Sequence, residues 1–326
     1  MMRATRWVVL GAALVAGGCS FRKLTADSTA DLLHASAPQF NTLEDLDFAE
    51  ESAPANLVTM ESVWRVSQEN EDVLVELVQG YAAYGYAFME DRMERAHAAD
   101  DDIAEQRYRQ RAQAAYRRAK GFGLRLLAAR HAVDGGPEAR LREGLPAWRA
   151  YLRRFDDRED VPALFWTANA WASLIGLSVD DTEALLDLPF AVALAERARD
   201  LDPDYAHGAV HAFFGVYHAS TPQAAGGRPD LARAAFERAL GLSNRHYLTW
   251  QVLEARTYAV MVQDRALYRR LLQEVLDAGD VMPEERLSNL VAKRRAERYL
   301  AEIDTVFPPA DEPAAEAPEA TTETTH

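Results

Sequence analysis

Apolar side chains recur every three to four residues along nearly every segment from Ala53 to Phe307. This spacing places them on one face of an α-helix, whereas a half-buried β-strand would alternate apolar and polar residues. In the last such segment, the opposite face contains Arg294, Arg295 and Arg298. Its apolar face contains Leu287, Leu290, Val291, Tyr299, Leu300, Ile303, Val306 and Phe307. The pattern predicts an all-α protein.

The one β-branched run, residues 73–78, also favours a helix, because it continues into Tyr81, Tyr84 and Phe88 without a turn. Helix breaks are expected where Gly, Pro and Asp residues gather. Such positions are Gly135–Pro137, Asp156–Pro162, Ser178–Asp181, Asp202–Pro203, Pro222–Pro229 and Gly279–Pro283. They divide the chain into about ten helices joined by short loops.

Three segments repeat a spacing of small residues around a central position. The first two segments read Ala-x3-aromatic-x2-Ala. The third has a small residue in the middle, and Pro203 lies five residues after its last alanine. The positions are Ala112, Tyr116 and Ala119, then Ala232, Phe236 and Ala239, and then Ala191, Ala195 and Ala198. This pattern resembles the second helix of a tetratricopeptide repeat, in which small residues let two helices approach closely.

The three segments are 79 and 41 residues apart, which are not multiples of 34. Any such repeats are therefore degenerate and separated by longer loops. A chance origin in an alanine-rich chain is the alternative, because small residues at helical spacing occur in any pair of packed helices. We expect a stack of degenerate tetratricopeptide-like helical hairpins, an α-solenoid.

The N-terminus has the pattern of a bacterial lipoprotein signal peptide, residues 1–18. Arg3 and Arg6 precede the short apolar run 7–15, and small residues 16–18 come directly before Cys19, the only cysteine. A signal peptidase would cut before Cys19, and the Cys19 thiol would receive diacylglycerol; acyl chains such as palmitate would then hold the protein at a membrane. An uncleaved anchor or a plain secreted protein is the alternative.

The destination of the protein and the roles of its remaining segments are inferred from residue identity and composition. The residue after the cysteine is Ser20 rather than Asp, which favours a periplasmic protein anchored to the outer membrane over one anchored to the inner membrane. Residues 19–52 are expected to form a lipid-anchored tether that becomes ordered only partway, and residues 53–307 the helical domain. Residues 308–326 contain Pro, Ala, Glu and Thr without core-forming side chains, so they are expected to be disordered.

The charge balance excludes two classes of partner. The chain has 36 Lys and Arg against 51 Asp and Glu, which gives a formal net charge of −15. A nucleic-acid-binding protein needs a basic surface to displace counterions from phosphate, and a polybasic membrane-surface protein needs one to bind anionic lipids. We therefore expect no nucleic acid, and membrane contact through the N-terminal lipid only.

Catalytic and metal-binding patterns are absent from the sequence. His207, His211 and His218 are predicted along one face of a helix, but no carboxylate or cysteine nearby completes a metal site. No nucleophile elbow, phosphate loop or dinucleotide fingerprint occurs. The pairs Asp156-Asp157 and Asp180-Asp181 suit helix starts, where anions complement the helix dipole. We expect no metal, no cofactor and no enzymatic activity.

Aromatic residues give the candidate binding positions, which are Trp166, Trp171, His211 and Tyr217. They belong to a cluster that also includes Phe165, Phe213 and Phe214. Trp166 and Trp171 are five residues apart, so they do not share one narrow stripe of a helix. Either both tryptophans are core, or some of the four residues line a groove or pore that faces an organic-acid ligand or a partner protein.

Several motifs in the second half occur together and in order. They are Phe165-Trp166 with Asn169-Ala170-Trp171-Ala172, Glu196-Arg197-Ala198 with Leu201-Asp202-Pro203-Asp204-Tyr205, Gly208-Ala209 with His211, Gly215 and Tyr217, Gly226-Gly227, Phe236-Glu237-Arg238-Ala239-Leu240, Asp264-Arg265 with Leu271-Leu272 and Val275-Leu276, and Asn289, Ala292, Arg294-Arg295-Ala296 and Ile303-Asp304 with Phe307. This series resembles the T component (TatT) of tetratricopeptide-repeat-associated TRAP transporters, closely over residues 164–307 and loosely over residues 56–127.

The resemblance implies a periplasmic lipoprotein that forms a homotrimer and pairs with the TRAP periplasmic solute-binding protein, the P component. It also implies a role in binding or guiding an organic-acid or hydrophobic ligand. The alternative function is a general envelope scaffold or outer-membrane assembly lipoprotein that uses its repeats to hold other proteins.

Overall fold

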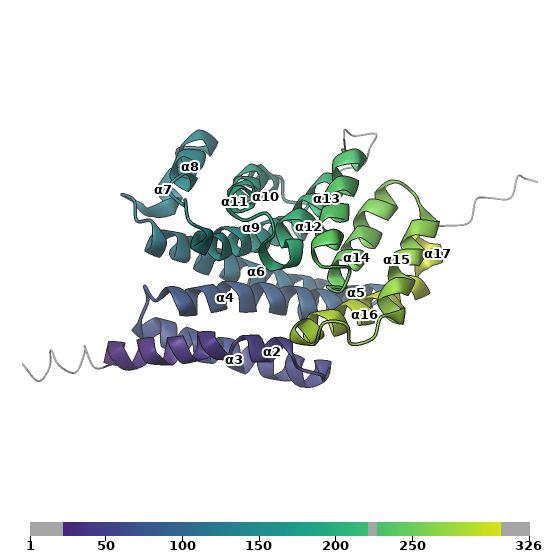
Figure 1. Cartoon of the computed structure of the whole chain (residues 1–326), viewed down its shortest axis with the longest axis horizontal. Helices are drawn as coiled ribbons and strands as arrows, with labels where there is room; N and C mark the ends of the chain where they lie inside the picture. The colour runs from purple at the N-terminus through teal and green to yellow at the C-terminus, as the bar shows by residue number, and fades with distance from the viewer. Residues whose placement is uncertain (1–21, 221–226, 308–326) are drawn as a thin grey trace, which may run out of the picture.

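The computed structural model describes residues 22–220 and 227–307, and every regular element in these two ranges is helical. The all-α prediction is therefore confirmed for this part of the chain. Figure 1 shows helical hairpins stacked along the long axis of the molecule, with the C-terminal helices closing one end beside α5. Cys19, the signal-peptide residues and residues 308–326 lie outside the described ranges.

The N-terminal third forms the lower layers of Figure 1. Residues 22–36 are helical and precede the labelled elements. These are α2 (Pro38–Asn41), α3 (Leu46–Val66), α4 (Glu71–Tyr84), the π-helix η1 (Gly85–Glu90), α5 (Asp91–Ala98) and α6 (Asp102–Arg130). The β-branched run 73–78 lies inside α4, as its uninterrupted apolar pattern predicts.

The middle third stacks on α6. Its elements are α7 (Gly136–Arg142), α8 (Leu145–Leu152), the 3-10 helix η2 (Arg158–Asp160), α9 (Val161–Gly176), α10 (Thr182–Leu186), α11 (Leu188–Leu201) and α12 (Tyr205–Ala219). The predicted breaks at Asp156–Pro162, Ser178–Asp181 and Asp202–Pro203 lie at boundaries between these helices, whereas the turns after α7 and after α10 were not predicted. Asp157 and Asp181 cap η2 and α10 by accepting hydrogen bonds from backbone N–H groups, so the aspartate pairs do stand at helix starts.

The last third closes the stack. Its elements are α13 (Pro229–Leu242), α14 (Thr249–Glu254), the π-helix η4 (Ala255–Ala259), α15 (Arg265–Asp277), the 3-10 helix η5 (Pro283–Glu285), α16 (Arg286–Ala301) and α17 (Ile303–Val306). Helix α16 packs against α2 and α3, so segments from the two ends of the described chain meet. None of the helices in residues 22–220 and 227–307 combines the length and the apolar character needed to cross a membrane.

The nine residues of the repeated spacing are all buried (Ala112, Tyr116, Ala119, Ala191, Ala195, Ala198, Ala232, Phe236 and Ala239). Their aromatic members pack against glycines of a partner helix. A Cβ atom on Gly85 would lie 2.9 Å from the ring of Tyr116, and one on Gly215 would lie 2.9 Å from the ring of Phe236. Small residues therefore allow the close helix–helix approach that the repeat pattern predicts.

The helical body begins well before residue 53, the predicted start of the domain, which falls inside α3. In the preceding helix, Ala26 and Ala30 are buried. The Asp27 carboxylate accepts hydrogen bonds from the Ser67 hydroxyl at 2.5 Å and the Asn70 amide at 3.1 Å. This part of the segment interpreted as a tether thus packs on the α3–α4 turn. The small and polar residues of this segment gave no apolar pattern that would have predicted the burial of Ala26 and Ala30.

Candidate functional site

Trp166 lies on α9 and contacts the first residue of α12. Its indole Nε1 donates a 3.0 Å hydrogen bond to the Tyr205 hydroxyl. The ring of Phe165 packs edge-on against both aromatic rings, with centroid distances of 5.3 and 5.7 Å. Burial raises the pKa of Tyr205 to about 12, so this hydroxyl remains protonated. Trp166 is only partly buried and is held in one orientation at the α9–α12 junction.

Trp171 is a core residue, with 2% of its surface exposed. Its ring stacks on Phe190 with an interplanar angle of 10°, and its Nε1 donates a 3.1 Å hydrogen bond to the Asp187 carboxylate. The Lys120 ammonium lies 3.7 Å from the ring centroid. Of the two alternatives left open for Trp171, its burial supports the core position rather than the lining of a groove. The indole fills the contact between α9 and α11, and Asp187 satisfies its one polar atom.

His211 and Tyr217 lie further along α12. Within the described residues, the Nε2 atom of His211 is buried without a hydrogen-bond partner. Burial, with Arg238 and Arg199 nearby, lowers the pKa of His211, so its imidazole is neutral at pH 7. Tyr217 is 37% exposed and packs edge-on against Phe214. Because Tyr205 and Tyr217 are at opposite ends of α12, Trp166 and Tyr217 do not share one site.

The three histidines do not form the continuous stripe that their spacing predicts. Ala206, His207 and Gly208 have left-handed backbone angles, with φ of 45°, 59° and 84°. His207 therefore leaves the α12 face and stacks on Tyr247, with a centroid distance of 5.5 Å. Over the ranges 22–220 and 227–307, no three His, Cys, Asp or Glu side chains are grouped so as to hold a metal ion.

A charged cluster between η1–α5 and the C-terminal helices was missed by the sequence reasoning. We call it the η1–α16 charge cluster; it comprises Glu90, Asp91, Glu94, Arg256, Arg294, Arg295 and Arg298. Both π-helices contribute, because Glu90 ends η1 and Arg256 lies on η4. Single π-helical turns inside α-helices are frequent at functional sites.

The acids of this cluster pair with arginines from two elements, α16 and η4. The Asp91 carboxylate is 2.7 Å from the Arg298 guanidinium and 3.2 Å from that of Arg294. Glu94 is 3.3 Å from Arg256 and accepts a hydrogen bond from the Tyr299 hydroxyl at 2.9 Å. Burial opposes the ionisation of Glu94, but the surrounding arginines lower its pKa to about 2. Glu94 is therefore charged at pH 7.

Arg295 is the centre of the cluster, and its side chain is fully buried. Its guanidinium donates a 2.6 Å hydrogen bond to the Tyr86 carbonyl and lies 4.0 Å from the centroid of the Tyr86 ring. The periodicity placed the three arginines of α16 on the face opposite its apolar side chains. The structure adds that η1 and α5 cover this second face. The cluster joins the last long helix to the N-terminal layers.

Comparisons with known proteins cover most of the chain. A family model described as "TRAP transporter T-component" matches residues 42–307. A protein of Treponema pallidum (strain Nichols), printed as "Uncharacterized protein", is 23% identical over 314 residues, which span 90% of this chain and 94% of the relative. The family match begins just before α3 and ends just after α17, so it includes the aromatic positions of α9 and α12 and the charge cluster.

Proposed function

The chain belongs to the TRAP transporter T-component family, and from this premise we propose that it is the accessory component that docks the solute-binding P component of such a transporter. The family consists of transporter components rather than enzymes. The match over residues 42–307 carries the proposal, since it includes the whole stack from α3 to α17. A stack of helical hairpins supplies extended surfaces of the kind that bind proteins.

Charge and exposed aromatic residues suggest how the partner is bound. The formal net charge of −15 favours a polar, salt-sensitive rim, and Tyr217, exposed near the C-terminal end of α12, is the aromatic anchor in this proposal. In the same proposal the chain forms a homotrimer and assists in binding or guiding an organic-acid or hydrophobic ligand. Half-buried Trp166 is the candidate contact for that ligand.

The docking proposal predicts a loss of affinity without a loss of fold. We expect Tyr217→Ala to weaken binding of the solute-binding protein by about tenfold, because exposed tyrosines are frequent hot spots. Ile103→Ala is the matched control, since Ile103 is 84% exposed on α6, distant in sequence from α12. Isothermal titration at low salt measures both, and circular dichroism checks the helix content. Equal affinities for the two variants would contradict the assignment of Tyr217.

The oligomeric state and the pairing are tested separately. Light scattering of the purified protein is expected to give a trimer, and a pull-down at low salt is expected to retain a TRAP solute-binding protein of the same organism. A clean monomer that ignores that protein would favour the alternative function, a general envelope scaffold or outer-membrane assembly lipoprotein.

Anchoring through Cys19 is a further part of the proposal and has its own test. We expect Cys19→Ser to leave the precursor unprocessed or to release the protein from membranes, because lipid attachment requires the thiol. Membrane fractionation and the intact mass of the mature protein measure this. Unchanged fractionation together with an unchanged mass would refute the lipoprotein assignment.

A further inference from the structure

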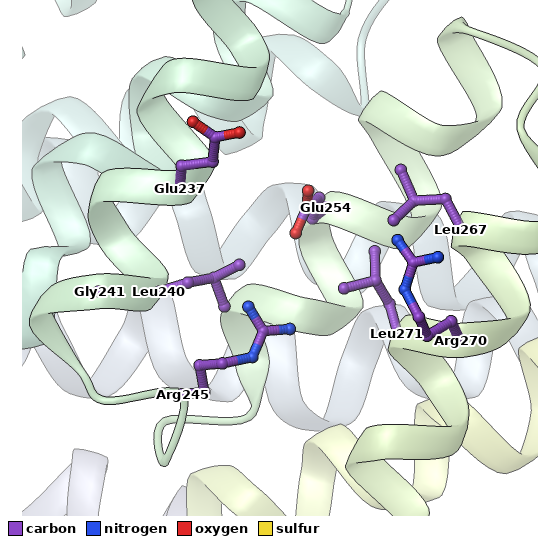
Figure 2. Close-up of a pocket in the computed structure, with 8 residues that line it drawn as sticks. All are labelled: Glu237, Leu240, Gly241, Arg245, Glu254, Leu267, Arg270 and Leu271. Carbon is purple, nitrogen blue, oxygen red and sulfur yellow. The ribbon is translucent and has the colours of Figure 1, made fainter.

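A pocket lies between α13, α14 and α15, and Figure 2 shows its lining side chains. Its volume is about 480 Å³, within the range of about 300–1,000 Å³ that is typical of small-molecule sites. Three leucines supply its apolar surface: Leu240 on α13, and Leu267 and Leu271 on α15. Gly241 leaves additional room, because a Cβ atom built there meets no atom of another described segment within 4 Å.

Glu254, the last residue of α14, presents an unused acceptor to this pocket. The residue is only 6% exposed, and its Oε2 atom is buried with no hydrogen-bond partner among the described residues. Figure 2 places its carboxylate in the middle of the lining, between Glu237 and Leu267. A buried carboxylate without a partner is costly, and a ligand that brings a positively charged donor removes this cost.

Of the two arginines that line the pocket with Glu254, one is already paired with another acid and the other is not. Arg245, from the α13–α14 loop, is already bound, because its guanidinium makes two 2.6 Å hydrogen bonds to the Glu274 carboxylate. Arg270 on α15 is exposed and has no ion pair in the described part of the chain. It is near enough to lower the pKa of Glu254, although the two side chains do not touch. A free cation and a free acid thus face one pocket from separate positions.

We propose that this pocket binds an α-amino acid with an aliphatic side chain. The ammonium group pairs with Glu254, the carboxylate pairs with Arg270, and the side chain lies against the three leucines. A simple amine leaves Arg270 unpaired, and a simple carboxylic acid leaves Glu254 unpaired. The site goes beyond the docking function and needs no partner protein.

The test compares three probes that differ by one group. Isothermal titration of the full chain at pH 8 uses L-leucine, 3-methylbutylamine, which lacks the carboxylate, and 4-methylpentanoate, which lacks the amine. We expect leucine to bind at least tenfold more tightly than either of the other two. No leucine binding, or an amine or acid that binds as tightly as leucine, would overturn the proposal.

Two substitutions separate the charged contacts. We expect Glu254→Gln and Arg270→Gln each to weaken leucine binding by at least tenfold, whereas Arg269→Gln, which does not line this pocket, leaves it unchanged. Burial and the nearby Glu237 and Glu274 raise the pKa of Glu254 to about 7, against the effect of Arg245 and Arg270. Leucine affinity of the unmodified chain is therefore expected to fall as the pH drops from 8 to 6. A pH-independent affinity would contradict the role of Glu254.

Filling the pocket gives a test that does not remove a charge. Gly241→Leu places a side chain in the open space and also favours the helix, so we expect the melting temperature to be maintained and leucine binding to be lost. Gly176→Leu is the matched control, because Gly176 ends α9 and is equally open. Undiminished binding by Gly241→Leu would place the ligand elsewhere and overturn the proposal. Because these measurements use the chain alone, a failed docking assay does not affect their outcome.

Discussion

Replacing Arg295 by methionine is expected to lower the free energy of unfolding by about 3–5 kcal/mol, since it removes the ion-pair partner of buried Glu90 and one of the three arginines around Glu94. The fully buried guanidinium lies 3.6 Å from Glu94 and 3.9 Å from Glu90, and it holds the Tyr86 carbonyl. Methionine keeps the aliphatic volume but removes the charge and the donors. Thermal unfolding followed by circular dichroism should show a melting temperature lower by roughly 10 °C.

A surface arginine supplies the control. Arg233 on α13 is mostly exposed, with its guanidinium 3.9 Å from the Glu237 carboxylate, so Arg233→Met should change stability by less than about 1 kcal/mol. Adding Glu90→Gln to Arg295→Met should restore part of the loss, because Arg295 is the one arginine within 4 Å of the Glu90 carboxylate among the described residues. If Arg295→Met is as stable as the unmodified protein, the η1–α16 charge cluster does not hold α16 in place.

The pH dependence of this loss has a defined sign. The pKa of Glu94 is lowered from its ordinary 4.5 to about 2 in the folded protein. Between these values the unfolded chain binds more protons than the folded one, so the stabilisation by Glu94 is fully present above pH 4.5 and falls as the pH approaches 2. The stability difference between Arg295→Met and the unmodified protein should decrease over the same interval.

The helical architecture followed from local patterns. Apolar periodicity and the Gly, Pro and Asp clusters are properties of neighbouring residues, and they predicted the all-α class and several of the breaks. The breaks after α3 and after α5 were not predicted. The alanine and aromatic spacing at Ala232, Phe236 and Ala239 identified a face that the structure buries. These local patterns predict burial correctly because they depend only on which face of a single helix packs against the core.

The charge cluster and Trp171 show where local patterns are insufficient. The acids at residues 90–94 precede the arginines of α16 by about 200 residues, so only the closed stack brings them together. Periodicity distinguishes the two faces of α16, but it does not tell whether the polar face meets water or another helix. The spacing of Trp166 and Trp171 likewise left open which indole was core, and the contacts of Phe190 and Asp187 with Trp171 decide it.

Ala239→Trp tests a repeat contact between two backbones, and we expect it to lower the free energy of unfolding by about 3 kcal/mol. Ala239 is fully buried, and a Cβ atom on Gly208 of α12 would lie only 3.0 Å from its Cα atom. The two backbones leave no space for an indole, so the substitution must separate α12 from α13. Ala234→Trp on the exposed face of α13 is the matched control and should change stability by about 0.5 kcal/mol at most. Urea unfolding measures both, and Ala239→Val provides a milder variant if the tryptophan protein does not fold. Equal stabilities of the Ala239 and Ala234 variants would mean that the repeat register does not define the α12–α13 contact.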